Sequence, residues 1–277
     1  MAPFHRPRRL ETRYLFDLEP LLLCWGKFPK AATLEQLFER MYDCSKATPF
    51  PQVERLAHGM VTAVAKENAQ SWRVAASKST QGKRIFDLLR TEMQGPIGQR
   101  MHMLVRKNAQ LIRSLPDDIA QDVVRQIATR QMRGERPEEI AKELAAKMPE
   151  IARSRVQLLA RTEVAKASEA ITRARSEALN LNWYQWLTAE DVRVRTSHRK
   201  MDLVLVNWSD PPSPEALSGE KNIGNYNAGG VFNCRCASAV IVDLDQVHWP
   251  AKVYRQGGIT RMSRAKFSKI AGVHVER

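Results

Sequence analysis

The residues best suited to chemistry are one histidine and two cysteines in the second half of the chain. Cys234 and Cys236 are separated by one residue, so in an extended strand both thiols would lie on the same face. His198 ends an alternating run that would turn its imidazole to the same inner side. Thiolates and imidazole are typical zinc ligands, and Asp191 or Asp202 would supply a fourth ligand. We therefore predict a candidate zinc site at His198, Cys234, Cys236 and Asp191, and no other cofactor.

The same residues allow two other interpretations. A single residue between the cysteines is shorter than the usual spacing of structural zinc sites, and Cys24 and Cys44 are distant in sequence. The thiols could therefore be small core residues beside a hydrogen-bonded histidine. In an enzyme, His198 would act as base and Cys234 as nucleophile, with Asp191 or Asp202 orienting the imidazole. Because no local pattern places the nucleophile at a helix start or a sharp turn, we predict no catalytic residues and no enzyme.

The charge balance indicates an anionic partner. The 277 residues include 44 Lys and Arg against 30 Asp and Glu, a formal net charge of +14. A run of basic residues is often only a solvated surface, but several runs on a strongly basic chain favour contact with phosphates, which is independent of sequence and sensitive to salt. The candidate nucleic-acid-binding residues are Arg193, Arg195, Arg199, Lys200, Arg261, Arg264, Lys266 and Lys269.

Composition excludes several classes of protein. Hydrophobic residues make up 43% of the chain, enough for a sizeable core, and four cysteines are too few for a disulfide scaffold. The apolar run at 21–25 is far shorter than the roughly 18 residues of a membrane-spanning helix. We therefore expect no membrane association and a reducing cytoplasm as the site of synthesis.

Proline and glycine positions divide the first two thirds of the chain. Prolines interrupt residues 1–50, which we predict to be an irregular arm with one or two short helices. Residues 51–180 have apolar residues at helical spacing and are predicted to form a helical domain, with helix starts at Pro116, Pro137 and Pro149.

After Asn180 the apolar period changes from helical to two. Strands are predicted at 183–187, 192–195, 203–208 and within 231–244, whereas 209–230 is a long loop rich in proline and glycine. Loops of this length usually bind something or are mobile. The prediction is an α+β fold: a helical body at about 50–180, a small β-rich module at 181–245, and a basic C-terminal tail at 246–277.

The order of motifs resembles the Mu F-like, or phage head morphogenesis, family of minor capsid proteins of tailed bacteriophages. A helix ending in Arg161-Thr162-Glu163 is followed by a run from Trp186 to His198 that includes Asp191, Arg193 and Arg195. After the Pro/Gly loop comes Phe232-Asn233-Cys234-Arg235-Cys236. The resemblance covers roughly residues 95–245. The family tends to have a glycine shortly after the histidine, where this chain has Lys200-Met201-Asp202-Leu203.

The resemblance implies a structural role in the virion. Family members are low-copy head proteins associated with the portal vertex, and they act in head assembly and sometimes in DNA packaging or delivery. The implied partners are the portal protein, the major capsid or scaffolding protein, and packaged double-stranded DNA. The implied location is the capsid interior near the portal vertex, after assembly in the host cytoplasm. The alternatives are a nuclease or toxin-like enzyme using His198, Cys234 and Cys236, and a non-specific DNA-binding module.

Overall fold

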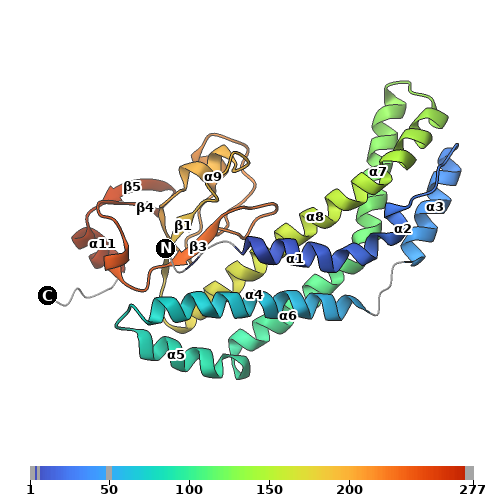
Figure 1. Cartoon of the computed structure of the whole chain (residues 1–277). Coiled ribbons are helices and arrows are strands. Elements are labelled where there is room, and N and C mark those ends of the chain that lie inside the picture. The colour runs from blue at the N-terminus through green and yellow to red at the C-terminus, as the bar shows by residue number, and fades with distance from the viewer. Residues whose placement is uncertain (1–3, 5–6, 48–51, 272–277) are drawn as a thin grey trace. The chain divides into compact units, whose positions relative to one another are not determined.

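The computed structural model describes Phe4, residues 7–47 and residues 52–271, and it confirms an α+β fold with a mainly helical body (Figure 1). The chain divides into two compact units. Unit 1 comprises Met1–Arg8, Val61–Met103 and Thr162–Arg277, and unit 2 comprises Arg9–Met60 and Leu104–Arg161. Within the described residues, no helix combines the length and apolarity needed to cross a membrane.

Residues 8–26 and 34–47 are helical, which corrects the prediction of an irregular arm at 1–50. Prolines limit the length of these helices without preventing them, because Pro20 occupies the first turn of a short helix, where no backbone donor is needed. Apolar residues three or four positions apart bury one face of each longer helix. Residues 1–3, 5–6 and 48–50 of the predicted arm lie outside the described residues. The elements are α1 (Arg8–Leu18), η1 (Glu19–Leu22), α2 (Leu23–Gly26) and α3 (Leu34–Ala47).

The helix starts at two of the three predicted prolines are confirmed. Pro116 lies in the first turn of α7 (Leu115–Met132), and α8 (Pro137–Ala178) begins at a proline. A new helix at Pro149 is wrong, since α8 continues through this residue for 42 residues in all. Proline leaves one carbonyl of the preceding turn without its helical donor, but the buried Met148 and Ala152 on either side anchor both halves in the core.

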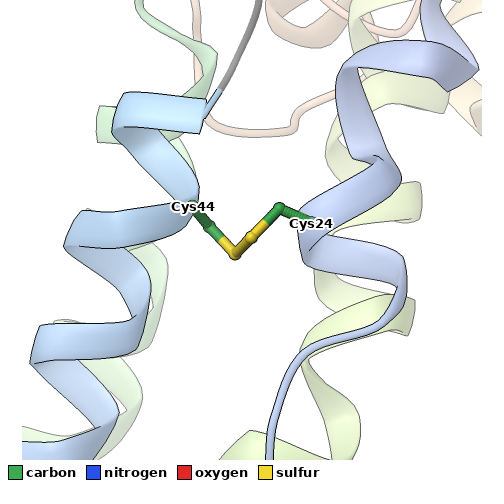
Figure 2. The surroundings of a disulfide bond; sticks show 2 residues. All are labelled: Cys24 and Cys44. Atoms are coloured by element: carbon green, nitrogen blue, oxygen red, sulfur yellow. A yellow bond between two sulfur atoms is a disulfide. The ribbon is translucent and has the colours of Figure 1, made fainter.

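A disulfide joins Cys24 of α2 to Cys44 of α3 within unit 2 (Figure 2). The two Cα atoms are 5.3 Å apart and the cysteines are 20 residues apart in sequence. Closing a loop of this size contributes about 3 kcal/mol by restricting the unfolded chain. This disulfide was not predicted, because a separation of 20 residues in sequence does not by itself indicate that two helices will meet.

The sheet of unit 1 has five strands in the order β3-β1-β2-β4-β5. The β1 strand pairs antiparallel with β2 and β3, β4 pairs antiparallel with β5, and β2 and β4 are parallel. The strands are β1 (Trp183–Leu187), β2 (Leu205–Asn207), β3 (Ala237–Val240), β4 (Ala251–Arg255) and β5 (Gly258–Met262).

Both faces of this sheet are apolar and covered. Alternate residues of a strand point to opposite faces, so Trp183 and Leu205 belong to a cluster with Phe267, whereas Tyr184 and Val206 belong to a second cluster. The second cluster includes residues of α4 (Val53–Ala76) and α5 (Gly82–Thr91), and it also contains both free cysteines. The candidate zinc ligands therefore lie at the packed face of the sheet.

The C-terminal part of the chain completes the sheet, which corrects the predicted end of the β-rich module at 245. The strands β4 and β5 form a hairpin whose turn residues Gln256 and Gly257 have φ values of 50° and 80°. A two-residue hairpin of this kind favours positive φ at both positions. Helix α11 (Arg264–Ala271) follows and packs Phe267 edge-on against Trp183. Residues 272–277 of the predicted tail lie outside the described residues.

The predicted strand at 192–195 is wrong. A side-chain oxygen of Asp191 accepts a hydrogen bond from the backbone N–H of Arg193 at 3.0 Å, and its carbonyl accepts one from Val194 at 3.1 Å. An aspartate that bonds the backbone two residues ahead turns the chain and competes with a strand. The short helix α9 (Thr196–Lys200) begins directly afterwards and carries His198.

A buried arginine connects three elements of unit 1. Arg175 of α8 is fully buried, and its Nε and Nη2 donate to the two carboxylate oxygens of Glu92 at 2.7 and 2.6 Å. Its Nη1 donates to Asn68 Oδ1 of α4 at 2.5 Å. Glu92 belongs to η3 (Glu92–Gln94), which precedes α6 (Pro96–Arg113). A buried charge is tolerated only when it is paired and hydrogen-bonded in this way.

We expect Arg175→Ala to lower the free energy of unfolding by about 3–5 kcal/mol, because the buried Glu92 carboxylate and the Asn68 amide lose their partner. Arg173→Ala is the matched control, because Arg173 forms an exposed pair with Glu177 one turn along the same helix and should contribute less than about 0.5 kcal/mol. Urea denaturation followed by circular dichroism measures both changes. Equal losses in the two variants would contradict the assigned role of Arg175.

Candidate functional site

Three of the predicted zinc ligands meet inside unit 1. Nδ1 of His198 lies 3.6 Å from Sγ of Cys234 and 3.4 Å from Sγ of Cys236, and the candidate ligand atoms all lie within 4.8 Å of one another. The three residues are 2%, 1% and 3% exposed, respectively. His198 comes from α9, and the cysteines come from the segment directly before β3. The predicted juxtaposition of imidazole and paired thiols is therefore present.

The other imidazole nitrogen is held by a hydrogen-bonded chain. Nε2 of His198 lies 2.8 Å from the Tyr226 hydroxyl, which donates to Oε2 of Glu215 at 2.5 Å. A carboxylate only accepts, so the Tyr226 oxygen accepts from Nε2–H and the Nδ1 lone pair faces the two sulfur atoms. Trp186 contacts the imidazole edge-on at 5.8 Å between ring centroids. The orientation and the tautomer of His198 are thus fixed by Tyr226, Glu215 and Trp186.

The environment distinguishes the two thiols. The hydrogen bond from Cys236 lowers the pKa of Cys234 well below its usual range, although burial opposes this shift. The backbone N–H of Cys236 also lies 3.4 Å from Sγ of Cys234 and stabilises its thiolate. The pKa of Cys236 is raised by its hydrogen bond to Cys234 and by burial. Cys234 is therefore the thiol that ionises first.

Segments far apart in the sequence connect at this site. Thr162 of α8 accepts a hydrogen bond on Oγ1 from the backbone N–H of Asn233 at 3.2 Å. Arg235, between the two cysteines, donates to Oδ2 of Asp191 at 2.7 Å. The Arg161-Thr162-Glu163 segment within α8, the run from Trp186 to His198 and the Asn-Cys-Arg-Cys segment therefore form one connected site.

The structure does not bring Asp191 or Asp202 to the cysteines as a fourth ligand. Asp191 accepts from Arg193 N–H and Arg235, and these bonds lower its pKa although desolvation acts in the opposite direction. Asp202 accepts from the backbone N–H and the hydroxyl of Thr188, both at 2.9 Å. Among the described residues, the group that could hold a metal comprises His198 and the two cysteines and excludes both aspartates.

Sequence reasoning missed Glu215 and Tyr226, which orient the histidine. Glu215 lies in α10 (Pro214–Leu217), and both residues belong to the loop at 209–230 that was predicted to bind something or to be mobile. Its length and its prolines and glycines were the available signal, but neither feature indicates which side chains point inward.

The candidate nucleic-acid-binding residues fall into two groups. Arg195 lies 3.7 Å from Glu215 and donates to the carbonyl of Phe232 at 3.0 Å, and Arg264 pairs with Asp245 at 2.5 Å. These two guanidinium groups therefore already have protein partners. The other candidates are exposed, and one of them, Arg199, also donates to the carbonyl of Val194 at 3.3 Å. These exposed residues are Arg193, Arg199, Lys200, Arg261, Lys266 and Lys269.

A small cavity beside Cys236 is lined by a half-buried carboxyl group. The cavity measures about 20 Å³, which is room for about one water molecule, and Glu169, Asn68 and Thr172 contribute to its lining. Burial raises the pKa of Glu169 to about 7, although Arg173, Arg100 and a hydrogen bond from Asn227 oppose the shift. Glu169 is therefore a group that titrates near neutral pH in the folded protein.

We expect the stability of the folded chain to fall as Glu169 ionises. Because its folded pKa of about 7 exceeds the ordinary value of 4.5, its contribution is fully present below about pH 4.5 and is lost as the pH rises through 7. The loss is on the order of 3 kcal/mol. Glu169→Gln should remove this pH dependence, whereas the exposed Glu177→Gln should retain it. Urea denaturation at pH 5 and pH 8 measures both, and an unchanged pH dependence in Glu169→Gln would reject the assignment.

Comparison with known proteins gives a family match over part of the chain. Residues 117–239 match the family model described as Phage Mu protein F like protein, in agreement with the resemblance noted in the sequence. An uncharacterized protein of Haemophilus influenzae is 25% identical over 221 residues, which cover 78% of this chain and 45% of that protein. The chain thus spans less than half the length of this relative. No solved structure matches the chain.

The segment after His198, where the family tends to have a glycine, contains one residue whose backbone conformation favours glycine. Leu203 has a φ of 61°, the left-handed conformation that favours glycine, and its backbone N–H donates to the carbonyl of Trp186 at 2.8 Å. The left-handed turn is thus formed although a leucine occupies the position. A leucine in this conformation costs roughly 1–2 kcal/mol relative to an ordinary backbone.

We expect Leu203→Gly to be neutral or to stabilise the protein by up to about 1 kcal/mol, because relief of the backbone cost exceeds the greater entropy of glycine in the unfolded chain. Leu203→Val should destabilise by about 1 kcal/mol or more, since branched side chains tolerate positive φ least. Thermal unfolding of the two variants beside wild type tests this order. A glycine variant less stable than the valine variant would contradict it.

Proposed function

We propose that this chain is a minor head protein of a tailed bacteriophage, which associates with the portal vertex and assists head assembly and DNA packaging or delivery. The observation that carries the proposal is the phage Mu F-like match over residues 117–239. The site supports it, because motif residues from three separate segments meet in one buried, hydrogen-bonded core. The portal protein is the proposed main partner, with the major capsid or scaffolding protein as further candidates, and the capsid interior is the proposed location.

A structural role for the site fits its burial better than an enzymatic one. A nucleophile or base must reach its substrate, but His198 and both cysteines are at most 3% exposed. We therefore propose that the cluster stabilises the fold and does not turn over substrate. A nuclease activity of the purified chain that is lost in His198→Ala would support the enzyme alternative.

Contact with packaged DNA is the second part of the proposal. Arg193, Arg199 and Lys200 are exposed on and next to α9, and Arg261, Lys266 and Lys269 are exposed on β5 and α11. With a net charge of +14, these residues are suited to neutralise phosphates without reading sequence.

The portal association is tested in assembling heads. Tagged chain should copurify with portal protein from procapsids of a phage that encodes it, and it should be present in mature heads. Its absence from both procapsids and virions would overturn the proposal.

The DNA contact is tested by salt dependence. Binding of purified chain to duplex DNA should weaken steeply with salt, and replacing Arg193, Arg199 and Lys200 by Gln should lower the slope of log K against log salt by up to about 3. Replacing three exposed lysines elsewhere, Lys83, Lys142 and Lys147, by Gln changes the net charge equally and should leave the slope nearly unchanged. Equal slopes in the two triple variants would reject this surface as the DNA contact.

A further inference from the structure

We propose that His198, Cys234 and Cys236 bind one zinc ion. In a tetrahedral site with Zn–S near 2.3 Å and Zn–N near 2.1 Å, neighbouring nitrogen and sulfur ligands lie about 3.6 Å apart. The distances from Nδ1 of His198 to the two sulfur atoms are 3.6 and 3.4 Å. Both nitrogen–sulfur distances therefore match those of a zinc tetrahedron, and all three ligand atoms lie within 4.8 Å of one another.

The histidine is prepared for metal binding by the groups behind it. A metal-ligating histidine usually donates its second ring N–H to a carboxylate, a carbonyl or a water molecule, which fixes the tautomer. Here Nε2 meets the Tyr226 hydroxyl at 2.8 Å, and that hydroxyl is itself bonded to Glu215 at 2.5 Å. These two hydrogen bonds leave the Nδ1 lone pair of His198 free to bind a zinc ion that the two thiolates also bind.

Charge and burial favour the same assignment. Two thiolates and one Zn²⁺ are neutral together, so metal binding removes the cost of an unpaired thiolate in the core of unit 1. Soft sulfur with one imidazole is a ligand set that suits zinc and not magnesium or calcium. The three protein ligands leave the fourth position of a tetrahedral zinc ion to a small ligand such as water.

The inference does not depend on the capsid role, because it is tested on the isolated full chain. Purified protein, equilibrated with zinc under mild reduction and freed of unbound metal, should contain one zinc per chain. Cobalt in place of zinc should give a thiolate-to-cobalt charge-transfer absorption, which reports sulfur ligation directly. Folded chain that retains no zinc and gives no such absorption would overturn the proposal.

Cysteine variants show whether the metal binds at Cys234 and Cys236 or at the other pair, Cys24 and Cys44. Cys234→Ser and Cys236→Ser should each lose the bound zinc and the cobalt absorption. The control is the double variant Cys24→Ser with Cys44→Ser, which removes the disulfide and should keep both signals. Zinc retained after replacement of both Cys234 and Cys236 would place the metal elsewhere and reject the site.

If the serine variants do not fold, zinc binding can be tested on the wild-type chain by measuring how zinc protects its thiols from alkylation. In native wild-type chain, zinc should slow the reaction of two thiols with an alkylating reagent, and a chelator should restore the rate. Equal rates with and without zinc would contradict the proposal.

The positioning role of Tyr226 has its own readout. Tyr226→Phe keeps all three ligands but removes the acceptor of Nε2–H, so zinc affinity in competition with a chelator should fall by about 10–100-fold at unchanged stoichiometry. An unchanged affinity would reject the part of the proposal that concerns Tyr226 and Glu215.

Discussion

The site depends on satisfying both nitrogens of a buried imidazole. His198 is almost fully excluded from water, so each ring nitrogen needs a partner inside the protein. Tyr226 and Glu215 supply one side, and Cys234 and Cys236 supply the other. Because removal of one partner leaves the others buried and unsatisfied, these residues act as a unit, and the loop at 209–230 is held to the sheet through them.

The rest of unit 1 holds the hydrogen-bonded residues around His198 in place. The sheet is packed on both faces, and Trp186 of β1 contacts the imidazole directly. Arg235 and Asp191 join the cysteine segment to the turn before α9, and Thr162 joins it to α8. Arg175 holds another part of α8 to α4 and η3. The geometry of the site is therefore determined by the packing of the whole unit and not by a single loop.

Much of the fold was predictable from the sequence because local signals were strong. Pro116 and Pro137 mark helix starts, and the aromatic run at 183–187 forms β1. His198, Cys234 and Cys236 do meet as predicted, although none of them lies in a strand as the prediction assumed. These features depend on residues close in sequence, where propensity and periodicity act directly.

The wrong and missing predictions concern segments whose structure is determined by tertiary contacts. Pro149 continues a helix because buried neighbours hold both sides, and Asp191 turns a run that alternates like a strand. The roles of Glu215 and Tyr226 depend on where a long loop folds back, which no local pattern encodes. The strands after residue 250 were assigned to a basic tail because their charged residues masked the alternation of β4 and β5.

The cross-link between Cys24 and Cys44 makes the rigidity of unit 2 responsive to its surroundings. In a reducing compartment Cys24 and Cys44 would remain two thiols. In an oxidising one, an oxidant such as dioxygen would take up the two electrons and two protons that the thiols lose as the S–S bond forms. The bond would therefore restrict the motion of α2 relative to α3 under oxidising conditions and leave it less restricted under reducing ones.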